Sequence, residues 1–104
     1  MMKPPMDLET FEAKAGTVAA LLKAISNGKR LMLLCKLVEH EELSAGDLAL
    51  EVGLSQSACS QHLAKMRDEG LITFRRESQT LHYRIADPRT HRLMATLYDL
   101  YCKD

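Results

Sequence analysis

The sequence has no tryptophan, only three tyrosines and two phenylalanines as aromatic residues, and no apolar run of the ~20 residues that a membrane span requires. Its first ten residues lack the apolar segment of a signal peptide, so we expect a cytoplasmic protein without a membrane partner. The three cysteines, Cys35, Cys59 and Cys102, are too few for a secreted disulfide scaffold. We therefore expect them to begin as thiols, and any bridge between them to act as a signal rather than as a structural crosslink.

The chain also lacks net charge, because 14 basic side chains balance 14 acidic ones. The distribution is uneven: residues 1 to 52 carry 6 basic and 8 acidic side chains, and residues 53 to 104 carry 8 and 6. Positive charge is thus expected on the second half. A length of 104 residues indicates one domain, residues 1–104 with 1–6 flexible, whose small core favours completion by a second subunit.

Helical periodicity dominates the first two thirds of the chain. A first helix is expected from residue 8 to 25, with its apolar stripe at Leu8, Phe11, Ala15, Val18, Leu21, Leu22 and Ile25. A second, over residues 29 to 41, places Leu31, Leu34, Cys35 and Val38 on one face, so Cys35 is expected to point inward. Two shorter helices follow, one from N-cap Ser44 to Gly53 and one from N-cap Ser55 to Gly70. Their arrangement around one glycine-containing turn predicts a helix-turn-helix.

After Gly70 the apolar period changes from 3.6 to 2, which predicts two strands, "LITFRRE" and "TLHYRIA", joined as an arginine-rich hairpin. A last helix then begins with Asp87 as N-cap and Pro88 at its first position. Its apolar stripe is Leu93, Met94, Leu97, Leu100 and Tyr101. The fold class is therefore mostly α with a β-hairpin wing (α+β), in the order α-α-α-α-β-β-α, a winged helix-turn-helix.

The fourth helix carries small and amide side chains where a DNA-reading helix needs them. Cys59, Leu63 and Met66 are suited to its inner face, which leaves Ser55, Gln56, Ser57, Ser60, Gln61 and Lys65 near its start available to bases and phosphates. The hairpin adds Arg75, Arg76, Gln79, His82 and Arg84, which suit phosphates or the minor groove. The alternative is a solvated polar helix beside an ordinary charged hairpin. Because two adjacent elements agree, the sequence favours binding to double-stranded DNA.

The segment "LSQSACSQHLAKMRDEGLITFRRESQTLHYRI" resembles the DNA-binding core of the ArsR family of bacterial repressors, and the likeness runs from about Leu8 to Cys102. The resemblance implies a homodimer built from the first and last helices, an inverted-repeat operator, and repression that an inducer relieves. It also implies that Gln56, Ser57, Ser60 and Gln61 read the bases.

The inducer is the harder question. Metal-sensing members of the family have a Cys-x-Cys pair on the helix before the recognition helix, where this chain has "LSAGDLA". Asp87 and His91 resemble part of another family metal site, but no second histidine follows. A metal-responsive repressor that uses Asp87 and His91 therefore remains an alternative, and we expect no bound cofactor or metal.

Cys35 and Cys102 are placed as in the HlyU-like and BigR-like branch of the family, whose members respond to oxidants or reactive sulfur. That resemblance implies two thiols close together in one subunit, joined on induction by a disulfide or polysulfide bridge. Taken alone, Cys35 suits a small core residue, but Cys102 near the terminus has no good core explanation. Cys59 is expected to be a core residue, and His40 to be solvated.

An enzyme is the competing class of protein. A thiol oxidoreductase needs a Cys-x-x-Cys pair at a helix start, and the sequence has none. It also has no glycine-rich phosphate loop and no Ser, His and Asp set in a catalytic context. We therefore expect a regulator and not an enzyme.

Overall fold

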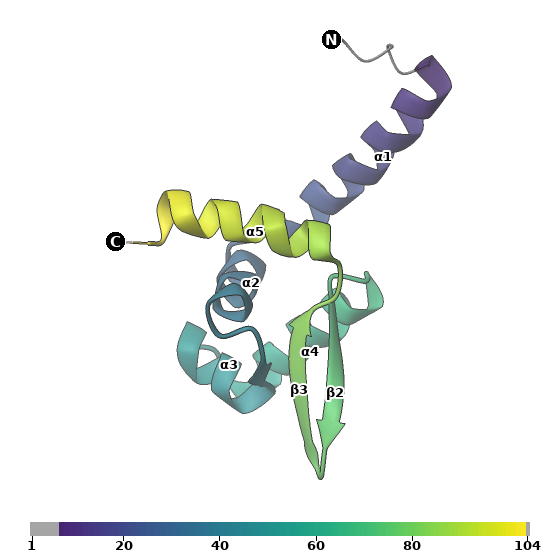
Figure 1. The fold of residues 1–104 in the computed structure, drawn as a ribbon. Helices are drawn as coiled ribbons and strands as arrows, with labels where there is room; N and C mark the ends of the chain where they lie inside the picture. Colours follow the sequence, from purple (N-terminus) through teal and green to yellow (C-terminus); the bar gives the residue numbers. More distant parts are fainter. Residues whose placement is uncertain (1–6, 104) are drawn as a thin grey trace.

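The computed structural model describes residues 7–103, so the expected flexible segment 1–6 lies outside the described residues. The elements, in chain order, are α1 (Leu8–Ile25), α2 (Gly28–His40), β1 (Leu43–Ser44), α3 (Ala45–Val52), α4 (Gln56–Asp68), β2 (Ile72–Glu77), β3 (Thr80–Ile85) and α5 (Pro88–Tyr101). The predicted winged helix-turn-helix is confirmed, with β1 as one addition (Figure 1).

The helix boundaries follow the capping residues that the sequence supplies. The side chains of Ser44, Ser55 and Asp87 each accept a hydrogen bond from a backbone N–H in the first turn of α3, α4 and α5. Gly53 ends α3 with φ 70°, a left-handed conformation that glycine adopts without strain. These caps fix the turn between α3 and α4, and therefore the direction in which α4 leaves it.

The wing is a three-stranded sheet, not the two-stranded hairpin that the sequence predicts. Strand order is β1-β3-β2, all antiparallel, with Leu43 opposite Tyr83 and Ser44 opposite His82. A two-residue strand has no periodicity of its own, so only its pairing with β3 reveals it. The pairing ties the middle of β3 to the start of α3.

The core lies between α2, the helix-turn-helix, the inner face of the wing and α5. Fully buried side chains come from every one of these parts, namely Leu33, Leu34, Leu37, Leu48, Leu63, Met66, Ile72 and Met94. On α2 the buried face is turned slightly from the predicted one, because Leu31, Cys35 and Val38 are only partly buried against this core. Cys35 therefore lies at the edge of the core and not inside it.

Helix α1 extends away from the rest of the molecule (Figure 1). The radius of gyration is 15.7 Å, whereas a compact chain of this length has about 13 Å. The predicted apolar stripe of α1 is present, but Leu8, Phe11 and Val18 are 71%, 58% and 52% exposed, and only Ile25 of this helix is buried. Within this single chain, the stripe has nothing to pack against along most of its length.

Among residues 7–103, no helix is both long enough and apolar enough to cross a membrane.

Candidate functional site

Helix α4 presents the predicted DNA-reading side chains to solvent. Its inner face, Cys59, Leu63 and Met66, is fully buried. The predicted DNA-contacting positions are all exposed, namely Ser55, Gln56, Ser57, Ser60, Gln61 and Lys65. Ser55 also has a structural role, because its Oγ accepts a hydrogen bond from the Ala58 N–H at 3.1 Å. The exposed face is polar and free of bulky side chains near the helix start, which allows close approach to the edges of DNA bases.

The wing is held by pairs of apolar side chains across its strands. Ile72 lies opposite Ile85, and Phe74 opposite Tyr83, with the last two ring centroids 5.6 Å apart. The guanidinium of Arg67, near the end of α4, lies 5.2 Å from the Phe74 ring centroid. The wing and α4 are therefore joined by a cation–π contact as well as by the core.

The wing residues that were predicted to contact DNA differ in whether they already have partners within the protein. Arg76 and Gln79 are exposed, and His82 is half-buried with Nε2 3.9 Å from a Glu77 carboxylate oxygen. Arg75 is already engaged: its Nε donates to both carboxylate oxygens of Glu42 at 3.0 and 2.9 Å, and its Nη1 donates to Glu77 at 2.7 Å. These hydrogen bonds hold the pKa values of Glu42 and Glu77 below their usual range.

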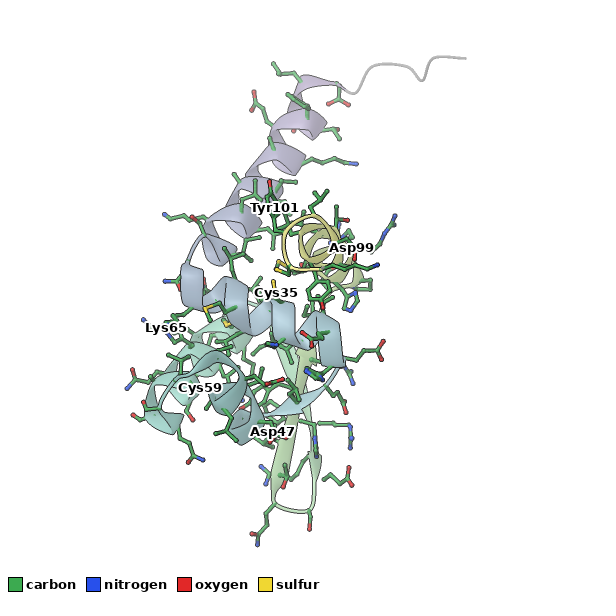
Figure 2. All side chains as sticks on the ribbon, turned by 90° about the vertical axis from the view of Figure 1, so that its left-hand side faces the viewer. Cys35, Asp47, Cys59, Lys65, Asp99 and Tyr101 are labelled. Carbon is green, nitrogen blue, oxygen red and sulfur yellow. The ribbon has the colours of Figure 1, made fainter. Side chains whose placement is uncertain are left out.

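Cys35 and Cys102 meet between α2 and the end of α5. Their Sγ atoms are 3.9 Å apart, and both thiols are free. Figure 2 shows Cys35 directed from α2 toward α5. Burial, followed by the contact with Cys102, raises the pKa of the Cys35 thiol to about 11. Cys102 is the exposed member of the pair, so a reagent from solvent reaches it first.

A cavity of about 340 Å³ opens beside the two sulfur atoms. Three elements supply its walls: Leu31, Met32, Cys35, Lys36 and Glu39 from α2, Glu51 and Val52 from α3, and Tyr98 and Cys102 from the end of α5. The arrangement therefore gives small molecules access to a pair of thiols. Of these residues, the sequence identified only the two cysteines as part of a functional site. Tyr98 could have been predicted from the sequence, because it precedes Cys102 by one helical turn and so lies on the same face of the last helix.

Cys59 and His40 both have contacts within the protein. Cys59 is fully buried with its Sγ 3.7 Å from the Ala45 carbonyl oxygen, which confirms it as a core residue. His40 is exposed, as expected, and its Nε2 also lies 2.9 Å from Glu51 Oε1. That contact joins the end of α2 to α3.

The alternative metal site finds little support in the geometry. Asp87 accepts hydrogen bonds from the Arg89 N–H at 2.7 Å and from its guanidinium, which hold the pKa of Asp87 below its usual range. Across residues 7–103, no three side chains of His, Cys, Asp or Glu come close enough together to hold a metal ion.

Known proteins resemble the chain over nearly its full length. Residues 27–73 match the family described as "Bacterial regulatory protein, arsR family". The HTH-type transcriptional regulator YgaV of Escherichia coli is 48% identical, over 92% of this chain and 97% of that protein. The transcriptional activator HlyU of Vibrio cholerae is 41% identical, over 95% and 91%. The structure of reduced HlyU from Vibrio cholerae superposes with a TM-score of 0.85 at 41% identity, over 92% of this chain and 100% of that one.

Proposed function

The chain belongs to the ArsR family and is a DNA-binding transcriptional regulator, not an enzyme; on that premise we propose that it is a homodimeric repressor released from DNA when Cys35 and Cys102 become bridged. The observation that carries the proposal is the 3.9 Å separation of the two free thiols. It would act in the cytoplasm, where both DNA and a reducing environment are present.

The homodimer is supported by apolar side chains that the single chain leaves uncovered. On α1 these are Leu8, Phe11, Val18 and Leu22, and on α5 they are Leu100 and Tyr101, at 68% and 81% exposure. An apolar-walled groove of about 460 Å³ also lies where α1 meets the starts of β2 and α5. A second copy that packs through α1 and α5 would cover these surfaces. It would also enlarge the small core that a chain of 104 residues can form alone.

Such a dimer has two copies of α4 related by a two-fold axis. We propose that they enter successive major grooves of an inverted-repeat operator, with half-sites about 34 Å apart. The proposed DNA-contacting residues are Ser55, Gln56, Ser57, Ser60, Gln61 and Lys65 on α4, and Arg76, Gln79 and His82 on the wing. Arg75 also belongs to the proposed DNA-binding surface, but because Glu42 and Glu77 already engage its guanidinium, we propose that it positions the wing on DNA. Residues 1–104 would act as one DNA-binding and dimerisation domain.

The chemistry of the switch begins at the exposed thiol. The Cys102 thiolate attacks the outer sulfur of a persulfide RSSH, forming Cys102–SSH and releasing the thiolate RS⁻. When the bridge is a trisulfide, the overall reaction consumes two protein thiols and two molecules of RSSH. Its products are the trisulfide bridge, two molecules of RSH and one molecule of H₂S. With peroxide, the Cys102 thiolate becomes a sulfenic acid and hydroxide leaves; the Cys35 thiol then displaces water to give a disulfide.

The separation of the thiols favours a bridge with additional sulfur. A direct disulfide requires the sulfurs at about 2.05 Å, and with S–S bonds of that length the outer sulfurs of a trisulfide and a tetrasulfide lie ~3.3 and ~4.3 Å apart. The observed 3.9 Å falls between the last two values. A polysulfide therefore needs less movement of α5 than a disulfide, which supports reactive sulfur as the inducer over peroxide.

A bridge would tie the end of α5 to α2. Helix α2 contacts α3 through the core and through the His40–Glu51 contact. Helix α5 supplies part of the proposed dimer interface, so a small tilt of α5 would change the spacing of the two α4 helices. Affinity for an operator of fixed half-site spacing would then fall.

The proposal is tested by titrating DNA with the reduced protein and with the protein after exposure to a persulfide donor, using an operator selected from a random duplex pool. Parent and Cys59→Ser proteins should both lose affinity on exposure. Cys102→Ser should bind DNA normally and retain its affinity. Equal release by Cys102→Ser and parent protein would contradict the switch.

A further inference from the structure

The cavity beside the two thiols is lined by both apolar and charged side chains. Leu31, Met32, Val52 and Tyr98 supply apolar surface, and Lys36, Glu39 and Glu51 supply a charged part of the wall, which we call the rim. We propose that this cavity is the docking site for the sulfur donor, and that its rim selects small neutral or cationic persulfides over anionic ones. The inference rests on the proposed dithiol switch and names its substrate class.

The positive charge at the rim is already compensated. The Nζ of Lys36 lies 3.2 Å from a Glu39 carboxylate oxygen and 4.0 Å from one of Glu51. One lysine between two glutamates leaves a net charge of −1 when His40 is neutral. Lys36 is therefore not a free anion-binding group, and a donor that carries a carboxylate meets an excess of negative charge.

The dimensions and position of the cavity suit a small organic molecule. At about 340 Å³ it lies at the lower end of the range for small-molecule sites, ~300–1,000 Å³. Its apolar wall can contact the aliphatic part of a donor while the terminal sulfur reaches Cys102. None of its lining residues belongs to α1, and Figure 2 places Tyr101 on the side of α5 toward α1 and Cys35 on the other side. We therefore expect the proposed dimer to leave the cavity open.

The test compares donors that differ in charge but little in size. We would measure the rate of Cys35–Cys102 bridge formation, by acid quenching and intact mass, with 2-aminoethyl, 2-hydroxyethyl and carboxymethyl persulfides. The expected order is cationic, then neutral, then anionic. A unit charge ~7 Å away in water changes the local concentration of a charged donor about threefold. The bridging rates with the cationic and the anionic donor should therefore differ about tenfold at low salt. The ratio should shrink as salt is added.

Rim variants then assign the selectivity to this cavity. Glu51→Gln removes the excess charge and should bring the cationic-to-anionic rate ratio close to one. Lys36→Met adds to the excess and should widen the ratio. Glu12→Gln, on α1 and outside the cavity, should behave as the parent. Within each variant the neutral donor serves as reference, so a change in thiol nucleophilicity cancels from the ratio.

The outcomes separate the two levels of the proposal. Bridge formation at equal rates by all three donors, or a ratio unchanged in both rim variants, overturns the docking site while leaving the dithiol switch in place. Absence of a bridge with every donor overturns the switch itself and the docking site with it.

Discussion

Arg75 on β2 and Glu42 before β1 join the wing to the turn that follows α2, with the arginine Nε donating to both carboxylate oxygens at 3.0 and 2.9 Å. Glu77 takes a further hydrogen bond from the same guanidinium at 2.7 Å. An arginine shared between two carboxylates is electrostatically compensated. The arrangement supports Arg75 as a residue that positions the wing, whereas Arg76, which is exposed, is available to phosphates.

This difference predicts unequal salt dependence of DNA binding. Each phosphate contact contributes about −0.9 to the slope of log K against log salt concentration. Arg76→Gln should therefore reduce the magnitude of the slope by about 1 per subunit. Arg75→Gln should lower affinity with the slope nearly unchanged, because it acts through the orientation of the wing. A slope that is also smaller by about 1 per subunit with Arg75→Gln would instead make this residue a direct phosphate contact.

Gln61 on α4 is expected to contribute to sequence recognition. Gln61→Ala should weaken specific binding by about 1–3 kcal/mol if the amide makes a bidentate contact to an adenine. Binding to unrelated duplex DNA should remain unchanged, because the substitution removes no charge. Competition between the selected operator and operators with single base changes checks this. The same loss for specific and unrelated DNA would show that Gln61 does not read a base.

The apolar stripe of α1 predicts an effect on assembly. Phe11→Glu places a charge on the 58% exposed stripe residue. It should weaken the dimer by about 3 kcal/mol or more, since the residue occurs twice in a two-fold interface. Sedimentation equilibrium measures the change. Ala13→Glu is the matched control, because two residues turn the helix by about 200° and place it on the opposite face. Equal dissociation by both variants would argue against an interface at this stripe.

The raised pKa of Cys35 predicts how its reactivity depends on pH. With a pKa of about 11, the reactive thiolate is scarce at neutral pH, so alkylation by iodoacetamide should rise about tenfold per pH unit between pH 8 and 10. Cys102→Ser should lower the apparent pKa of Cys35, because it removes the contact with the Cys102 thiol, while burial keeps this pKa above that of an exposed thiol. Peptide mass mapping gives the rates. A plateau below pH 9 in the parent would contradict the effect of partial burial and of the Cys102 contact on Cys35.

The order of the elements could be predicted because each carries a local signal. N-caps at Ser44, Ser55 and Asp87 and the change of period after Gly70 are properties of neighbouring residues, and the structure confirms them. Strand β1 was not predictable, because two residues form a strand only when β3 lies beside them. The exposed stripe of α1 had the right period, but periodicity alone does not say whether the burial partner is the same chain or another.

In the candidate site too, some features could be predicted from local sequence and others could not. The exposed face of α4 follows from helical geometry, so its residues could be named from the sequence. The proximity of Cys35 and Cys102 came from a family resemblance, since 67 positions separate them. Glu51 at the cavity rim depends on how α3 packs against α2, and the engagement of Arg75 by Glu42 depends on the pairing of β1 with β3. Such relations arise only from the tertiary fold.

The most direct test of the dithiol switch is the intact mass of the protein after exposure to a persulfide donor, followed by digestion to identify linked peptides. The account predicts a crosslink between the peptides of Cys35 and Cys102 whose mass exceeds that of a disulfide by one or two sulfur atoms, with Cys59 unmodified. A plain disulfide formed only by peroxide would contradict the preference for reactive sulfur. Thiols that stay unlinked under both treatments would contradict the switch.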